Sequence, residues 1–381
     1  RWCIFRLFGI NYGISNKERR PKLIKQKLNE KGNKGNVTIA KQKVLQSYDH
    51  YIALDWSIIN MAIARLTPKT NEPKIIDVPS DIKELKLYLK NLQGTKIMTI
   101  EETTTSHWLY VELYDYADKI IICDPYRNRL LSDGPKNDKI DAGKLCLLLK
   151  NGMLKEVFHS NDKLYDLRKL VSYYDDEVKA GVRLMNQKSA LFRAENKSYK
   201  KKETIEATGI NKFIVSQLDE KINLYIDKKQ NYEDEFYKIT KGNKTIKSLM
   251  SIPGIGIISS VTILSTVVDA RRFKSSNHYL SYCGLANHKK MSGGRNYGKR
   301  LPRYSRKLKS VYKSAAVRVI STNNPIKEYY AYLIKEKSVT EQNANNAVAR
   351  YIARVSLGII KSGKKFKPYS WRKNKKEKDV A

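Results

Sequence analysis

Hydrophobic and polar residues alternate in three different ways along the chain, and each pattern predicts a different architecture. From Tyr51 to about residue 160, short apolar runs rich in β-branched residues recur, and a helical stretch, DIKELKLYLKNL, follows the third of them. The runs read YIALD, MAIARL, KIIDV, IMTIE and KIIIC. Runs of this length and composition are typical of buried strands. We therefore expect a mixed α/β domain over residues 49–160.

From residue 161 onwards, apolar residues recur every three or four positions in two long stretches, a period that predicts amphipathic helices. The repeating positions are Leu164, Leu167, Leu170, Val171, Tyr174 and Val178, then Leu218, Ile222, Tyr225, Tyr232 and Phe236. Their charged outer faces suit an antiparallel helical hairpin with a turn near Gly209 and Asn211. We expect a coiled-coil arm over residues 161–245 that provides reach or dimerisation.

The third region, residues 246–362, is expected to be mostly helical, and it opens with the sequence SIPGIG. Gly254 and Gly256 free the backbone for a tight bend, which resembles a helix-hairpin-helix turn. Backbone amides at the start of the following helix could bind a phosphate there. An ordinary turn between two helices is nearly as good an interpretation.

The two ends of the chain are basic and lack apolar periodicity. Residues 1–48 are expected to form a loosely ordered arm. Residues 363–381 form a basic tail, in which Tyr369 and Trp371 could stack on bases while the lysines follow phosphates. A tail that only aids solubility is the alternative.

Charge changes this picture more than any other feature of composition. Lysine and arginine number 74 against 38 aspartate and glutamate, a formal net charge of +36. A surface this basic binds phosphates and releases counterions, so nucleic acid is the expected partner. The four cysteines include no CxxC pair, which disfavours a zinc ribbon or a disulfide framework and fits a reducing compartment. The sequence contains no run of eighteen apolar residues, so it predicts no membrane-spanning helix.

Four acidic residues stand where a metal site could form: Asp55, Glu101, Asp138 and Asp141. Asp55 ends the run YIALD and Glu101 ends the run IMTIE, so both are expected at the same edge of one sheet. Asp138 and Asp141 are three residues apart at the predicted start of a helix, a spacing that points both carboxylates the same way. Hard oxygen ligands suit Mg²⁺ or Mn²⁺, which support phosphoryl transfer. Mg²⁺ or Mn²⁺ is therefore the expected cofactor.

Each acid also has a simpler explanation. An aspartate at a strand end commonly begins a turn, and Asp138 could cap its helix. Glu102 competes with Glu101, because strand alternation turns one of two neighbours inward and the other away. We favour Glu101 and keep Glu102 as the alternative.

In these motifs the chain resembles the IS-one-ten group of transposases. YIALD corresponds to the family's first acidic motif, IEETTTS to its Ile-Glu-Ala-Thr-Gly motif, and KNDKIDA to its Lys-x-Asp-x-x-Asp-Ala motif. SIPGIG and FKSSNHYLSYCGL extend the match, which covers about residues 49–362. The resemblance implies an α/β ribonuclease-H-like (RuvC-like) domain over residues 49–160 with a metal-binding DEDD site, and a C-terminal transposase domain over residues 246–362.

The resemblance also implies a function, that of a DNA transposase or recombinase of a mobile insertion sequence. In that family a structured noncoding guide RNA from the element pairs with donor and target DNA while the protein cuts and rejoins strands, and the resemblance implies the same partners and reaction here. Strand exchange needs at least two active sites, so a homo-oligomer, either a dimer or a tetramer, is expected. The protein would work at the nucleoid in a prokaryotic cytoplasm. The residues expected to contact nucleic acid are Gly254, Gly256, Arg295, Lys299, Arg300, Arg303, Arg306 and Lys307.

The family's metal site cooperates with a serine nucleophile, and here the chain departs from the family pattern. The family's Gly-x-x-Ser-Lys-x-Gly-Asn-x-x-Leu-Arg stretch corresponds to GKRLPRYSRKLK, and an ungapped alignment puts Leu301 at the serine. A leucine cannot attack a phosphate. Ser305 is our preferred substitute and Tyr304 the other. Ser292 in MSGG is a further hydroxyl nearby, although Ser-Gly-Gly is first a turn signal.

Two other functions stay open. A metal-dependent endonuclease or junction resolvase would use the acids for hydrolysis alone, without a covalent intermediate, and the missing serine favours it. A repurposed, non-catalytic RNA- and DNA-binding protein would retain affinity only. The four intact acids argue against that second alternative.

Overall fold

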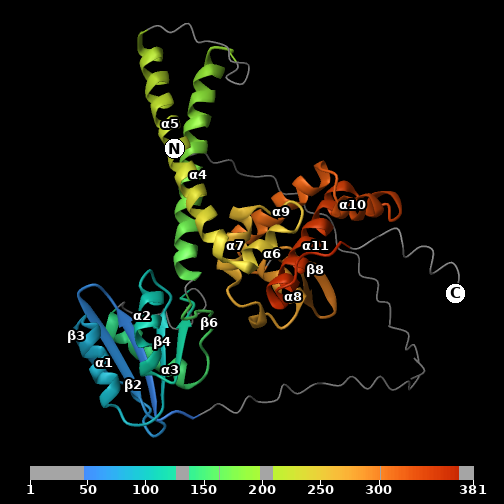
Figure 1. Ribbon diagram of the computed structural model, residues 1–381. Helices are drawn as coiled ribbons and strands as arrows, with labels where there is room; N and C mark the ends of the chain where they lie inside the picture. Colours follow the sequence, from blue (N-terminus) through green and yellow to red (C-terminus); the bar gives the residue numbers. More distant parts are fainter. Residues whose placement is uncertain (1–46, 126–136, 163, 198–208, 301, 369–381) are drawn as a thin grey trace, which may run out of the picture. The chain divides into compact units, whose positions relative to one another are not determined.

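The computed structural model describes residues 47–125, 137–162, 164–197, 209–300 and 302–368 (Figure 1). The chain divides into two units, one that ends at His159 and one that begins at Ser160, and each has its own hydrophobic core. Most of the expected N-terminal arm lies outside the described residues, as do Leu301, Tyr369 and Trp371.

The first unit is built on a mixed sheet, as the apolar runs predict. Among the described residues its strands are β1 (His50–Trp56), β2 (Asn60–Leu66), β3 (Lys74–Pro79), β4 (Lys96–Glu101), β5 (Lys119–Cys123) and β6 (Glu156–Val157). Their order across the sheet is β3-β2-β1-β4-β5-β6. β1, β4 and β5 run parallel to one another, and the other pairs are antiparallel. The α/β class is therefore confirmed.

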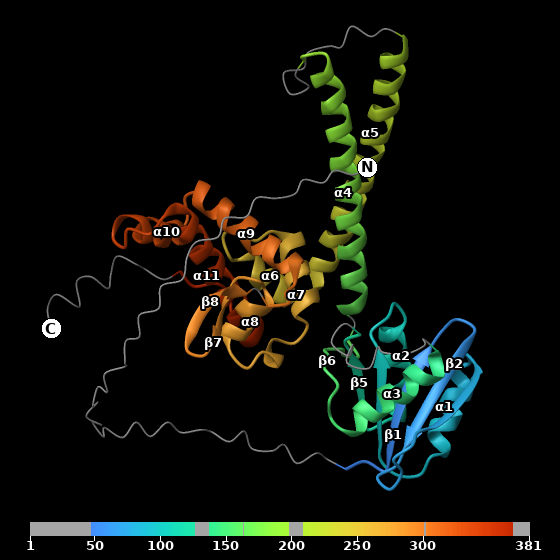
Figure 2. The ribbon, with the colours of Figure 1, turned by 180° about the vertical axis from the view of Figure 1, so that it is seen from behind.

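Helices cover both faces of this sheet (Figure 2). They are α1 (Ile82–Asn91), α2 (Ser106–Leu113), the single turn η1 (Tyr114–Tyr116) and α3 (Asp138–Lys150). Ile52 and Leu54 of β1 pack into the core that contains Leu109 of α2, whereas Ala53 between them packs into the core that contains Ala142 of α3. Because successive strand residues point to opposite faces, α1 and α2 cover one face and α3 covers the other.

Small side chains let α3 lie close to the sheet. Ala53, Ala62 and Ala64 are buried on the face that α3 covers. In α3 itself, a Cβ added to Gly143 would lie 3.1 Å from Cδ1 of Ile75 in β3. The sequence of this face therefore fixes α3 against β1 and β2.

The second unit begins with two long helices, α4 (Leu164–Ala194) and α5 (Gly209–Gly242), which pack against each other as a hairpin. The ring of Tyr174 in α4 makes edge contacts with Tyr232 and Phe236 of α5. A Cβ added to Gly181 would lie 2.4 Å from the ring of Tyr225, so glycine is required at this close approach.

The structure corrects the position of the turn between these helices. Gly209 and Asn211, which we expected in the turn, are the first and third residues of α5. Because α4 ends at Ala194 and α5 begins at Gly209, the connection between them falls before the position that we expected.

The remaining elements of the second unit surround one core. They are α6 (Lys244–Met250), α7 (Ile257–Val267), η4 (Ala270–Arg272), α8 (Ser276–Tyr282), β7 (His288–Ser292), β8 (Arg295–Arg300), α9 (Arg306–Ser321), α10 (Pro325–Lys335) and α11 (Glu341–Ser362). The hydroxyls of Tyr279 and Tyr312 meet at 2.5 Å inside this core. Tyr174 and Phe236 belong to the same core, so the long helices are packed onto the smaller ones. No helix in the described part of the chain is long and apolar enough to span a membrane.

Candidate catalytic site and nucleic-acid interface

Asp55 and Glu101 are neighbours at one edge of the sheet. β1 and β4 are parallel, and their register pairs Leu54 with Ile100, so the next residue on each strand is one of these two acids. Asp55 lies two residues after Ala53, on the strand face that α3 covers. Glu101 has the same relation to the α3 face of β4, because Met98 and Ile100 face the opposite core. Strand alternation therefore favours Glu101 over Glu102.

The first turn of α3 lies over the same row of the sheet. The register aligns Asp55 with Ala62 of β2, and Ala62 with Asp77 of β3. Lys139 in the first turn of α3 forms an ion pair with Asp77, with Nζ and Oδ2 3.3 Å apart. The helix start that carries Asp138 is thus tied to the row that contains Asp55.

Asp138 and Asp141 both lie in the first turn of α3, and neither is the residue that caps it. The cap is Asn137, whose side-chain oxygen accepts a hydrogen bond from the backbone N–H of Lys139 at 3.0 Å. Asp138 is therefore not present as a helix cap, because its neighbour Asn137 has that role. Negative charge in the first turn is also favourable beside the positive end of a helix dipole.

Electrostatics link the four acids directly. Burial, together with the negative charges of Asp138, Glu101 and Asp141, raises the pKa of Asp55 to about 6. The three acids that repel Asp55 are the three that the sequence grouped with it. Among the described residues, however, no three His, Cys, Asp or Glu side chains converge as they would in an assembled metal site. The acids are electrostatic neighbours and an all-oxygen donor set, without the closed geometry of a filled site.

Sequence reasoning missed a further acid at this edge. Asp124 directly follows β5, whose Cys123 pairs in register with Glu101, and only 4% of Asp124 is exposed. Its backbone N–H donates to the carbonyl of Lys155 at 3.1 Å. The available signal was an acid directly after the run KIIIC.

The structure gives Ser305 a clear structural task. Its hydroxyl caps α9 by accepting a hydrogen bond from the backbone N–H of Leu308 at 3.3 Å, and its own N–H donates to the carbonyl of Tyr282 at 2.8 Å. Tyr304 beside it packs its ring over Gly284, where an added Cβ would lie 2.4 Å from the ring. Both side chains are therefore used in packing or capping.

Ser292 lies at the tip of the hairpin formed by β7 and β8. Gly293 and Gly294 form the turn with φ values of 52° and 75°, left-handed conformations that favour glycine. The register places Ser292 directly opposite Arg295, so the two side chains share one face of the hairpin. Both residues are exposed.

The hairpin and α9 belong to a stretch without any acidic residue. Residues 270–327 contain 15 lysines and arginines and no aspartate or glutamate. Every described residue of β7 and β8 is exposed. Of the six basic residues expected to contact nucleic acid, five are exposed, namely Arg295, Lys299, Arg300, Arg303 and Arg306. Lys307 instead forms an ion pair with Asp175, with the charged atoms 3.0 Å apart.

The SIPGIG segment forms a turn between α6 and α7, and its two glycines differ. Gly254 has a φ of +80°, and an added Cβ would lie 2.8 Å from both the carbonyl oxygen of Ala315 and Cγ2 of Val319 in α9. Gly256 has nothing within 4 Å of that position. Gly254 is thus explained by packing, and its contact with nucleic acid stays a prediction.

Comparison with known proteins finds similarity to transposases. The model of the Transposase IS116/IS110/IS902 family matches residues 246–331. The insertion element IS110 uncharacterized 43.6 kDa protein of Streptomyces coelicolor is 24% identical over 160 residues, which cover 42% of this chain and 39% of that protein. The transposase for insertion sequence element IS1111A of Coxiella burnetii is 22% identical over 174 residues, which cover 42% of this chain and 48% of that protein. The chain thus spans less than half the length of these curated relatives.

Proposed function

We propose that this chain, a member of the IS116/IS110/IS902 family of transposases, is the transposase or recombinase of an insertion sequence and cuts and rejoins DNA strands. The observation that carries the proposal is the row of acids at the sheet edge, where Asp55 and Glu101 are neighbours below the start of α3. Three antiparallel strands followed by two that run parallel to the first, in the order β3-β2-β1-β4-β5, support a ribonuclease-H-like (RuvC-like) first unit.

Asp55, Glu101, Asp138 and Asp141 would hold Mg²⁺ or Mn²⁺. Their oxygens are the ligands that these hard cations prefer, and a cation would offset the repulsion that raises the pKa of Asp55. When bound, the ion would stabilise negative charge on the attacking and leaving oxygens of the transferred phosphate. The protein's part is to fix the carboxylates on two strands and one helix of a packed domain.

For the nucleophile we propose Ser292 ahead of Ser305. Ser305 would have to give up its capping hydrogen bond to attack, whereas Ser292 is exposed with the cationic Arg295 opposite. Attack by the Ser292 oxygen on phosphorus would form a phosphoserine ester and break the bond to the sugar oxygen, which leaves with a proton as a hydroxyl. Arg295 would stabilise the negative charge that develops on the phosphate.

The basic stretch of the second unit would bind nucleic acid, with the exposed hairpin as its most accessible part. A structured guide RNA is proposed as the second nucleic-acid partner, on the strength of the family relationship. A homo-oligomer is proposed because strand exchange needs more than one active site, and the α4–α5 hairpin offers a surface for self-association.

Trapping of a covalent adduct between protein and DNA tests this function against its rivals. The substrate is duplex DNA that carries the ends of the element, incubated with Mg²⁺. The parent should form an adduct that Ser292→Ala abolishes and that Ser305→Asn and Tyr304→Phe retain. Cutting without any adduct would select a metal-dependent endonuclease, and binding without cutting would select a non-catalytic protein.

The same experiment decides between the two serines. Asparagine is as good a helix cap as serine but carries no hydroxyl, so Ser305→Asn removes only the chemistry. Loss of the adduct in this variant, with Ser292→Ala still active, would return the nucleophile to Ser305. Sequencing of RNA that copurifies with the chain tests the guide, since one discrete species is expected and random cellular RNA would argue against it.

A further inference from the structure

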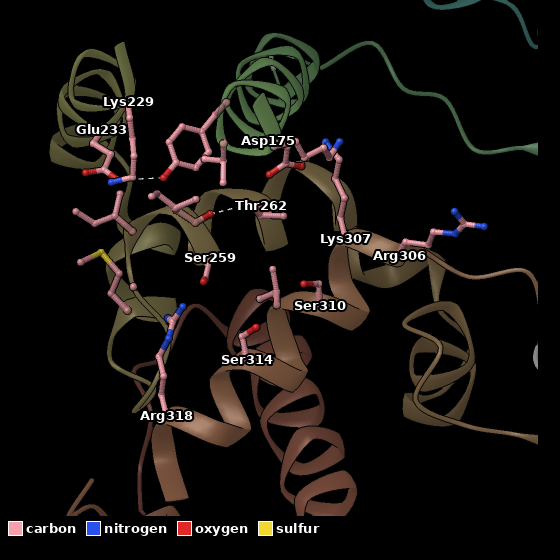
Figure 3. Close-up of a pocket in the computed structure, with 18 of the residues that line it drawn as sticks. Asp175, Lys229, Glu233, Ser259, Thr262, Arg306, Lys307, Ser310, Ser314 and Arg318 are labelled. Atoms are coloured by element: carbon pink, nitrogen blue, oxygen red, sulfur yellow. Dashed lines mark hydrogen bonds and ion pairs between the residues drawn. The ribbon is translucent and has the colours of Figure 1, made fainter. Parts of the chain in front are cut away.

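A cavity of about 1130 Å³ lies within the second unit, with α9 on one side and α4, α5 and α7 around the rest of it (Figure 3). None of the residues that line it belongs to the sheet of the first unit or to the β7–β8 hairpin. Its volume is slightly above the range for small-molecule sites, which is about 300–1,000 Å³. A space of this size could take a few nucleotides of one strand, but not a duplex.

Helix α9 presents a polar, basic stripe to the cavity. Lys307, Ser310, Ser314 and Arg318 all line it and follow one another at steps of three and four residues, the spacing of a single helix face. Figure 3 shows the two serines and Arg318 along this face of α9, with Ser259 of α7 opposite. The helix from Arg306 to Ser321 contains five basic residues and no acid. The stripe therefore offers hydroxyl donors and positive charge together.

Basic side chains outnumber acidic ones around the cavity. Five basic side chains line it against two acidic ones, Asp175 and Glu233. Both acids are already neutralised, because Asp175 pairs with Lys307 at 3.0 Å and Glu233 pairs with Lys229 at 2.7 Å. Arg318 has no carboxylate partner within the described residues, and its Nη1 donates to the carbonyl of Gly254 at 3.3 Å. Lys179 pairs with Asp176 at 2.8 Å, so the positive charge left for a ligand is that of Arg306 and Arg318.

The wall opposite the stripe is aromatic and apolar. Tyr237 of α5 lines the cavity and is 59% exposed. Val178 of α4 and Ile257 and Ile258 of α7 line it as well. Proteins that bind single strands combine a basic track for the backbone with aromatic side chains on which bases stack.

We infer that this cavity binds a short single-stranded segment of nucleic acid, with its phosphates along the stripe of α9 and its bases against Tyr237 and the apolar wall. The inference rests on the proposed function, because it takes nucleic acid as the ligand. It adds a site for one strand, apart from the exposed hairpin.

A charge placed inside the cavity tests this inference. Ser314 lines the cavity and is exposed, so Ser314→Glu adds a negative charge to the stripe. Val317→Glu is the matched control, since Val317 is 63% exposed on the same helix but does not line this cavity. The probe is a fluorescent 12-nucleotide single strand, as DNA and as RNA, titrated with the full chain in a fluorescence anisotropy experiment. We expect Ser314→Glu to weaken binding at least tenfold and Val317→Glu to change it less than threefold.

Arg318→Gln is the second variant, in case Ser314→Glu lowers the melting temperature, and it should weaken binding several-fold. Cross-linking of an iodouracil-substituted strand, followed by peptide mapping, should label Tyr237. Equal affinities of Ser314→Glu and Val317→Glu, or cross-links confined to the hairpin, would overturn the cavity site while the proposed function stands. A parent chain that binds neither single strands nor duplex DNA would overturn both. Duplex binding without single-strand binding would remove the cavity proposal alone.

Discussion

Asp55 is held in a position that is costly for a charged group. Burial and three neighbouring acids raise its pKa to about 6, so the folded chain binds a proton at Asp55 more tightly than the unfolded chain does. Asp55 therefore destabilises the fold at neutral pH, and that cost disappears as the pH falls through about 6 toward the ordinary pKa. A residue kept at such a cost is typical of a functional site.

We expect Asp55→Asn to stabilise the metal-free chain. Partial exposure of the site screens the repulsion, so the gain in free energy of unfolding at pH 7 should be about 1–2 kcal/mol. Thermal unfolding in EDTA at pH 7 and pH 4 measures this, and the gain should vanish at pH 4. Asp115→Asn, at an exposed position of the same unit, is the control and should have little effect. A less stable Asp55→Asn protein at pH 7 would contradict this interpretation.

Ser305 should matter for stability through its cap. Loss of the hydroxyl in Ser305→Ala should lower the free energy of unfolding by about 1 kcal/mol, as is usual for a removed helix cap. Ser305→Asn should keep the parent stability, because its side-chain oxygen can accept the same hydrogen bond. Urea unfolding measures both variants, and equal stability of alanine and asparagine would show that the cap contributes nothing.

At the scale of elements, the turn between α6 and α7 is held against α9 by a close contact. Gly254→Ala places a Cβ 2.8 Å from the carbonyl oxygen of Ala315 at a φ of +80°. We expect a loss of about 1–3 kcal/mol in the free energy of unfolding from overpacking and backbone strain. Gly256→Ala is the matched control two residues away, where there is open space, and it should cost much less in the same urea titration. Equal losses would mean that the contact with α9 does not decide the requirement for glycine.

The sequence predicted the helices and strands better than it predicted the tertiary contacts between them. β-branched runs identified β1 to β5, and apolar periodicity identified α4 and α5, because both signals depend on local spacing. The grouping of Asp55 with Asp138 followed from motif order, while the row through Asp77 that ties α3 down required the sheet register.

Other features depended on tertiary packing and could not be predicted. The cavity is lined by residues of helices that are far apart in the chain, from Tyr174 to Arg318. The capping role of Ser305 depends on the start of α9 at Arg306, which the sequence pattern did not fix. The turn before α5 was placed too late because glycine at position 209 begins a helix here instead of a bend.

At the scale of the whole molecule, the net charge of +36 should dominate affinity for nucleic acid. We expect binding to a duplex of unrelated sequence to weaken by about 10³-fold or more between 50 and 200 mM salt, the range for roughly six or more phosphate contacts. Fluorescence anisotropy at several salt concentrations gives the slope. An affinity that does not change with salt would show that the basic residues do not contact phosphates.

The four acids in the first unit are the centre of the account, and calorimetric titration of Mn²⁺ into the metal-free chain at pH 7 tests them most directly. The parent should take up Mn²⁺ saturably, Asp55→Asn should lose that uptake while staying folded, and Asp115→Asn should retain it. An absence of saturable uptake by the parent, or full uptake by Asp55→Asn, would contradict the account.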